Sequence, residues 1–242
     1  MHKVYENIYI GNFIYLLGVI SERERLASSK EANLSVSLYQ QTPSDPHIGD
    51  FFSTLDGRSI IIEFKKDEAS IDKKEVEKQE QLYYKLKNKE TDPDLKTLST
   101  SCHFLGVGEN ISGGSANIHF RLYTKLPNGT PITTPIETFI SNYCTGKKIN
   151  IHQLNNLQYS TTIGSDSKKF KDYLELLRSL NSSKRTASSG GLIVNISPEG
   201  KINLLSTPNI QSLLQHLSDL NQSLQKAAPQ PAFEPKNAPQ LR

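Results

Sequence analysis

The chain has 242 residues, of which 36% are hydrophobic and 22% are charged, and its formal net charge is +3. This composition is typical of a globular protein with a polar surface, and so small a charge permits nucleic-acid binding without arguing for it. The two cysteines, Cys102 and Cys144, lie far apart and lack metal-ligand spacing. They imply neither a disulfide framework nor a zinc site, and they fit a reducing cytoplasm.

Residues 1–41 are predicted to form two helices. The apolar run from Ile8 to Ile20 is interrupted by Asn12 and follows Glu6, where a signal peptide would carry positive charge. It is also too short to span a bilayer. We therefore expect a buried helix and no membrane segment.

The second of these helices is predicted to begin at Ser28 or Ser29, since serine is a favoured N-cap residue. Leu34 and Leu38 share a face with Glu31 at helical spacing. Acidic residues are favoured in the first turn of a helix by its macrodipole, which is sufficient reason for a glutamate at position 31.

A β-hairpin is predicted around the Asp56-Gly57 dipeptide. Apolar and aromatic residues flank it on both sides, in the runs 48–52 and 60–64, and Asp-Gly between two such runs is a strong hairpin signal. The second run is rich in isoleucine, as expected of a central strand that is covered on both faces.

Charged residues gather where this hairpin leaves the core. Because side chains alternate along a strand, Glu63 and Lys65 fall on one face and Phe64 on the other. The hairpin also brings Asp50 back towards Glu63. Two carboxylates and one ammonium would then converge, and such groups must be paired or bound to metal when they lose hydration. Oxygen donors of this kind suit Mg²⁺.

An amphipathic helix is predicted from about residue 72 to residue 89. Val76, Tyr83 and Leu86 recur at helical spacing, and Gln79 falls on the same stripe. Gln79 and Tyr83 are four residues apart and would lie one turn above the other. The lysines of this helix are interpreted as a solvated face.

The remaining elements follow from similar patterns. Strands are predicted over 103–107 and 118–123, a short helix from Thr134-Pro135 to before Gly146, a helix from Ser165 or Ser167 to Leu180, a hairpin of strands 192–196 and 201–205, and a terminal helix from Thr207-Pro208. The terminal helix carries a leucine stripe broad enough to pack on the domain or on a second subunit. From Ala227 the composition predicts a disordered tail.

The Asp50 and Glu63-Phe64-Lys65 pattern resembles the PD-(D/E)XK nuclease superfamily. The Gln79-X-X-X-Tyr83 pair after it resembles the RecB-like and lambda-exonuclease-like branch. The resemblance implies an α/β fold with a mixed central sheet flanked by helices, a restriction-endonuclease-like core of the αβββαβ type, and a C-terminal extension. It also implies Mg²⁺-dependent hydrolysis of phosphodiesters, with Mn²⁺ as a substitute metal.

By this resemblance, Asp50, Glu63 and the carbonyl of Phe64 hold the metal, and Lys65 positions the attacking water. Gln79 and Tyr83 contact the substrate. Many family members carry a glutamate on the helix before the Asp strand, for which the candidate is Glu31 and the reserve is Glu24. Gly49 stands where a proline usually precedes the aspartate, so Asp56 and Asp45 are alternative ligands. Asp56 is better explained as a turn residue, and Asp45 precedes Pro46 in a predicted loop.

The sequence therefore predicts a nuclease core over 1–110, an extension of the same domain over 111–226, and the tail over 227–242. The expected function is a cytoplasmic Mg²⁺-dependent nuclease, with DNA favoured over RNA as the substrate, in defence against foreign DNA or in DNA processing. The alternative is an inactive nucleic-acid-binding or protein-interaction subunit that keeps the fold.

Overall fold

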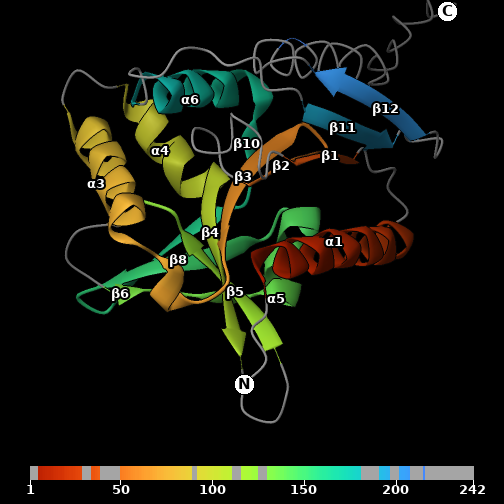
Figure 1. Ribbon diagram of the computed structural model, residues 1–242, viewed down its shortest axis with the longest axis horizontal. Helices are drawn as coiled ribbons and strands as arrows, with labels where there is room; N and C mark the ends of the chain where they lie inside the picture. Colours follow the sequence, from red (N-terminus) through yellow and green to blue (C-terminus); the bar gives the residue numbers. More distant parts are fainter. Residues whose placement is uncertain are drawn as a thin grey trace, which may run out of the picture.

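The computed structural model describes residues 5–28, 34–38, 50–88, 92–110, 116–124, 130–180, 191–196, 202–207 and residue 215. Figure 1 shows a sheet between two groups of helices. In chain order, the first half contains α1 (Glu6–Ser28), β1 (Leu34–Leu38), β2 (Phe51–Leu55), β3 (Arg58–Lys65), the 3₁₀ helix η1 (Glu68–Ser70), α3 (Lys73–Lys87), α4 (Pro93–Cys102) and β4 (His103–Asn110).

The second half adds shorter strands and two further helices. They are β5 (Ala116–Leu122), β6 (Thr130–Pro131), β7 (Thr134–Pro135), α5 (Ile136–Thr145), β8 (Lys148–Leu154), β9 (Leu157–Thr162), β10 (Ser165–Asp166), α6 (Ser167–Leu180), β11 (Gly191–Ile196) and β12 (Ile202–Thr207). No helix among the described residues has the length and apolarity needed to cross a membrane.

The main sheet follows the order β12-β11-β1-β2-β3-β4-β5-β7, with β10 paired to β3. Its described strands are antiparallel except for β3 and β4, which run parallel with Glu63 opposite Leu105. A parallel pair needs a crossover, and here α3 and α4 supply it. A second sheet has the order β6-β8-β9.

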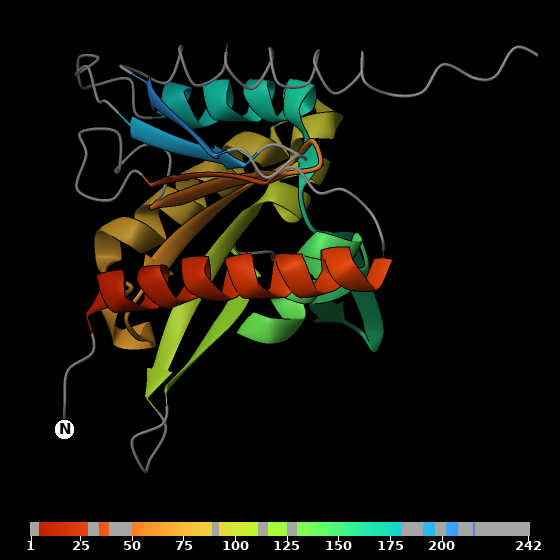
Figure 2. The same ribbon diagram turned by 90° about the vertical axis from the view of Figure 1, so that its right-hand side faces the viewer.

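Helices cover the main sheet on both faces (Figures 1 and 2). On one face α1 and α5 bury an aromatic cluster centred on Phe13, whose ring lies 5.0 Å from that of Phe51. On the other face α3, α4 and α6 cover Phe52, Ile61 and Leu105. The isoleucines of β3 thus contact both layers, which is why this strand has a continuous apolar run.

The predicted mixed α/β sheet with flanking helices is confirmed. The hairpin of β2 and β3 turns at Asp56-Gly57, both with positive φ, as the Asp-Gly signal predicts. The predicted helices before Gly146 and up to Leu180 correspond to α5 and α6, and β11 pairs with β12 as a hairpin.

One element was assigned incorrectly and one was missed. Residues 34–38 form β1, between β2 and β11, where the sequence predicted a second N-terminal helix. Helix α4 was not predicted, although Pro93 stands in its first turn and Asp92 caps it by accepting a hydrogen bond from the N–H of Asp94. The predicted C-terminal helix and tail fall outside the described residues, apart from Gln215.

Candidate active site

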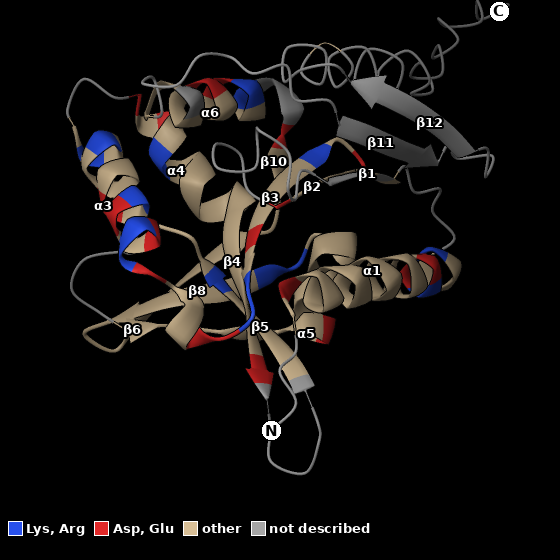
Figure 3. Ribbon diagram, in the orientation of Figure 1, with Lys and Arg blue, Asp and Glu red and all other residues tan. Residues whose placement is uncertain are grey.

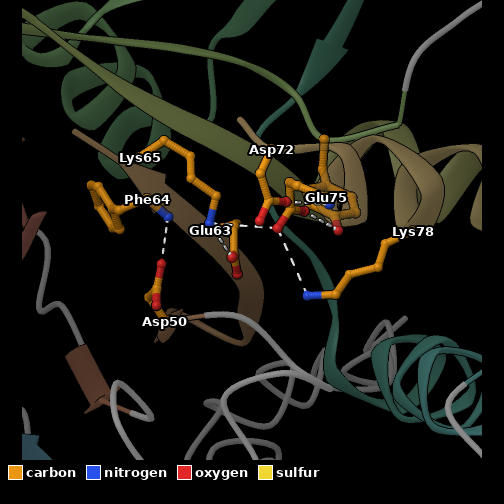
Figure 4. Close-up of polar contacts among 8 residues, drawn as sticks. Asp50, Glu63, Phe64, Lys65, Asp72, Glu75 and Lys78 are labelled. Carbon is orange, nitrogen blue, oxygen red and sulfur yellow. Dashed lines mark hydrogen bonds and ion pairs between the residues drawn. The ribbon is translucent and has the colours of Figure 1, made fainter. Parts of the chain in front are cut away.

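The β2–β3 hairpin brings Asp50 beside Glu63. Phe51 pairs with Ile62, so Asp50, which precedes Phe51, lies next to the following position on β3. The backbone N–H of Phe64 donates a hydrogen bond of 2.6 Å to Asp50 Oδ2. Asp50 is only 3% exposed, so this bond fixes a buried carboxyl at the end of the sheet (Figure 4).

Glu63 and Lys65 lie on the same face of β3, as their spacing predicted. Lys65 Nζ is 2.5 Å from Glu63 Oε1, and both side chains are almost buried. Phe64 points to the opposite face, where it is fully buried in the aromatic cluster. Figure 4 shows the lysine amine next to the Glu63 carboxylate and Asp50 at the backbone of Phe64.

A third buried acid, Glu75, completes this face of the site, and the sequence analysis missed it. Its side chain is 5% exposed, and its Oε2 lies 3.5 Å from Lys65 Nζ and 3.7 Å from Lys78 Nζ. Its Oε1 accepts a hydrogen bond of 2.5 Å from the hydroxyl of Tyr123. Helix α3 presents Glu75 because it begins just before it, where Asp72 accepts a hydrogen bond from the Glu75 N–H.

A fourth acid, Glu6, approaches from α1, close enough for its charge to raise the pKa of Asp50. The first turn of α1 is held there by Tyr9, which packs against β4 at Gly108. A Cβ atom at position 108 would lie 2.4 Å from the Tyr9 ring and 2.5 Å from the carbonyl oxygen of Lys66. The absence of a side chain at Gly108 therefore allows α1 to approach the site.

The reserve candidate Glu24 is not at the site. It accepts hydrogen bonds from Arg23 and from Ser141 on α5. Eighteen residues separate it from Glu6 on one helix, a distance of about 27 Å at 1.5 Å per residue. The other glutamate candidate, Glu31, and the alternative ligand Asp45 lie outside the described residues. Asp56 occupies the turn at the far end of the hairpin and is exposed, so it is no ligand here.

The carboxyl groups resist ionisation in this environment. Burial, followed by the charge of Glu63, raises the pKa of Asp50 to about 9. Burial also raises the pKa of Glu63 to about 7, against the opposing effect of Lys65. Burial alone would lower the pKa of Lys65, but Glu63 and then Glu75 raise it above its usual value, so its amine is an ammonium.

The predicted substrate-contacting pair lies on α3, one and two turns beyond Glu75. Gln79 is buried, and its Nε2 has no hydrogen-bond partner among the described residues. Tyr83 is half-buried and lies under the amine of Lys87, 5.9 Å from the ring centre. The predicted apolar stripe was partly wrong, because Val76 is exposed and Glu75 takes the buried position. Figure 3 shows acidic and basic residues interleaved along α3.

The donor set fits a hard divalent cation. In the part of the chain that the structure describes, no group of three or more His, Cys, Asp or Glu side chains is arranged to hold a metal ion. Mg²⁺, however, is commonly held by one or two carboxylates together with waters and substrate phosphates. Asp50 and Glu63 supply two carboxyls whose ionisation is opposed by burial, and a cation would relieve that opposition.

Comparisons with known protein families, with curated proteins and with solved structures gave no match to this chain. The functional interpretation therefore depends on the residues and their geometry.

Proposed function

We propose that this chain is a Mg²⁺-dependent nuclease that hydrolyses phosphodiester bonds in DNA. The observation that carries the proposal is the meeting of Asp50, Glu63 and Lys65 at the carboxyl end of β3, with the amine 2.5 Å from the Glu63 carboxylate. Buried charges of this kind are costly to maintain, and clusters of groups with shifted pKa values are typical of functional sites.

The order of elements supports the same proposal. The chain runs α1, β1, β2, β3, α3, α4 and β4, which is the αβββαβ succession of the PD-(D/E)XK core with one additional helix. Asp50 directly precedes β2, and Glu63 and Lys65 lie at the end of β3. These are the positions expected for the metal ligands and the lysine of that superfamily.

In this proposal Asp50, Glu63 and the Phe64 carbonyl hold the metal, and Glu6 adds a nearby negative charge in the role expected of Glu31. The bound Mg²⁺ would supply a polarised water and neutralise charge on the phosphate. Lys65 lies between the carboxylates of Glu63 and Glu75, which favour its charged form, so in this proposal it acts as a cation and a hydrogen-bond donor. Its role is to orient the attacking water and stabilise negative charge as the P–O bond breaks.

Gln79 is proposed to contact the substrate. Its amide nitrogen is buried and has no hydrogen-bond partner in the described part of the chain, so it can donate to a phosphate or base oxygen. Tyr83, one turn further along α3, offers a ring face against which a sugar or base can pack.

One observation favours the alternative of an inactive binding subunit. Lys65 already lies between two carboxylates, Glu63 and Glu75, and this closed set of ion pairs needs no metal to be satisfied. A protein of this second kind would bind nucleic acid or a partner protein without cleaving and without being stabilised by Mg²⁺.

The deciding experiment incubates the full chain with linear, circular and single-stranded DNA and with RNA, in Mg²⁺ and in EDTA. Wild type should cleave at least one substrate only with metal, and Lys65→Ala should abolish cleavage. Lys73→Ala is the matched control, because Lys73 lies on α3 with its side chain 91% exposed. Cleavage by Lys65→Ala at the parental rate would reject the assignment, as would inactivity of the wild type on every substrate with both Mg²⁺ and Mn²⁺.

Thermal unfolding separates the two functions independently of cleavage. A cation that binds the folded state raises its apparent stability by mass action. Mg²⁺ should therefore raise the Tm of the wild type and leave that of Asp50→Asn unchanged, whereas the binding subunit would show no shift in either protein.

A further inference from the structure

The mechanism above leaves one buried acid of the site without a role. The Glu75 side chain is 5% exposed, and its carboxylate contacts Tyr123, Lys65 and Lys78. Burying a carboxylate costs free energy unless every oxygen is satisfied, and here both oxygens have partners. Because Glu75 is held in this way beside Lys65, it can restrict the position of the Lys65 amine.

The protein interior fixes Glu75 from behind. Tyr123 donates to Glu75 Oε1, and its ring stacks on His103 with centroids 4.0 Å apart and planes 8° from parallel. His103 Nδ1 in turn lies 2.9 Å from the hydroxyl of Tyr173 on α6. Residues from α6, from β4 and from just beyond β5 thus form a rigid support, and the carboxylate of Glu75 has little freedom to move away from Lys65.

Lys65 has two carboxylate partners of unequal distance, Glu63 at 2.5 Å and Glu75 at 3.5 Å. Glu63 is the partner that the proposed metal would share, because it stands beside Asp50. An oxygen of Glu63 that turns towards a cation is lost to Lys65. Glu75 is held by Tyr123 through Oε1 and faces Lys65 and Lys78 through Oε2, so it would keep its contact with the ammonium.

We propose that Glu75 is a positioning residue that holds the Lys65 ammonium in place when Glu63 turns to the cation. The inference rests on the proposed nuclease function. Glu75 contacts neither substrate nor metal in this arrangement. Its action is to keep Lys65 aimed at the reacting phosphate.

The test uses Glu75→Gln, which keeps the shape of the side chain and can still accept the Tyr123 hydrogen bond. The kcat should fall by about 10- to 100-fold, since small displacements of a catalytic group cost rates of this order. KM and the Mg²⁺ affinity measured by calorimetry should change by less than about threefold, because neither ligand touches Glu75. Glu77→Gln, an exposed acid on the same helix, is the matched control and should behave as wild type.

The second readout does not depend on activity. In full-length protein with ¹³C-labelled lysine, NMR relaxation of the Lys65 side chain reports its order with and without Mg²⁺. Wild type should keep Lys65 ordered in both states. Glu75→Gln should keep it ordered without Mg²⁺, when Glu63 still holds it, and release it when Mg²⁺ is added.

A variant of the tyrosine that holds Glu75 distinguishes a positioning role of Glu75 from an effect on folding. Tyr123→Phe removes the hydroxyl that holds Glu75 and leaves the ring stacked on His103, so it should lower kcat by less than Glu75→Gln does. If wild type cleaves and Glu75→Gln cleaves equally well with Lys65 ordered in Mg²⁺, the inference is overturned and the nuclease function stands. If wild type neither binds Mg²⁺ nor cleaves, the function itself fails.

Discussion

Replacing Asp50 by asparagine should make the metal-free protein more stable, by an amount that grows as the pH rises. The buried Asp50 carboxyl has its pKa raised to about 9, whereas an unfolded chain ionises aspartate near pH 4. Between these values the folded protein binds a proton that the unfolded chain releases. The stability of the wild type therefore falls with increasing pH across this window.

The size of the effect follows from proton linkage. One proton bound only in the folded state changes the unfolding free energy by about 1.4 kcal/mol per pH unit. Asparagine cannot ionise, and its Oδ1 can still accept the Phe64 N–H. From about pH 6 to about pH 8 we therefore expect the stability of Asp50→Asn relative to wild type to improve by roughly 1–3 kcal/mol. A domain has only about 5–15 kcal/mol in total, so this change is readily measured.

Urea unfolding in EDTA, followed by circular dichroism at several values from about pH 5 to about pH 8, measures this difference. Glu77→Gln removes an exposed acid and is the control for the loss of one carboxyl group. A difference between Asp50→Asn and wild type that stays constant with pH would refute the reasoning, because it would mean that Asp50 ionises in the folded protein as it does in water. The prediction does not depend on catalysis.

Three further predictions concern the framework around the site. Burial lowers the pKa of His103 to about 3, so below about pH 6.5 only the unfolded chain takes up the proton and the free energy of unfolding should fall. In urea titrations, His103→Gln should lose less stability than wild type over this acidic range. Gly146 ends α5 with a φ of 71°, and Gly146→Ala should cost about 1 kcal/mol and lower the Tm by about 2–4 °C in calorimetry. Phe13 is fully buried among four other phenylalanine rings, and Phe13→Ala should cost about 3–5 kcal/mol in denaturant unfolding; a loss below about 1 kcal/mol would mean that α1 is not packed there.

The hairpin and its charged end could be predicted from the sequence because both depend on neighbouring residues. The Asp-Gly turn sets the register, and the register places Asp50 beside Glu63. Alternation along the strand then places Lys65 on the side of Glu63. Each step uses the two-residue periodicity of a strand over a short distance, so few other strand registers are compatible with the sequence.

The segment 34–38 was assigned incorrectly because two periodicities coexist in it. Leu34 and Leu38 are four apart, as on a helix, but Leu34, Val36 and Leu38 also alternate with serines, as on a strand. A five-residue run cannot decide between these patterns. The choice is made by tertiary structure, because β1 fills the position between β2 and β11.

The acids Glu6 and Glu75 could not be identified from the sequence for a different reason. Each lies in the first turn of a helix, where acidic residues are favoured by the macrodipole and need no other explanation. Their function depends on where those helices pack. Glu75 is held in the site by Lys65 and by Tyr123, which lies 48 residues later and supplies a buried hydrogen bond.

The close approach of α1 to β4 restricts position 108 to glycine. The ring of Tyr9 occupies the space that any side chain at Gly108 would need. A smaller residue at position 9 would not make room for alanine at 108, because the backbone carbonyl of Lys66 would still lie 2.5 Å from its Cβ atom. Among variants that retain the site, whether evolved or selected in a library, position 108 should therefore stay glycine even where position 9 changes.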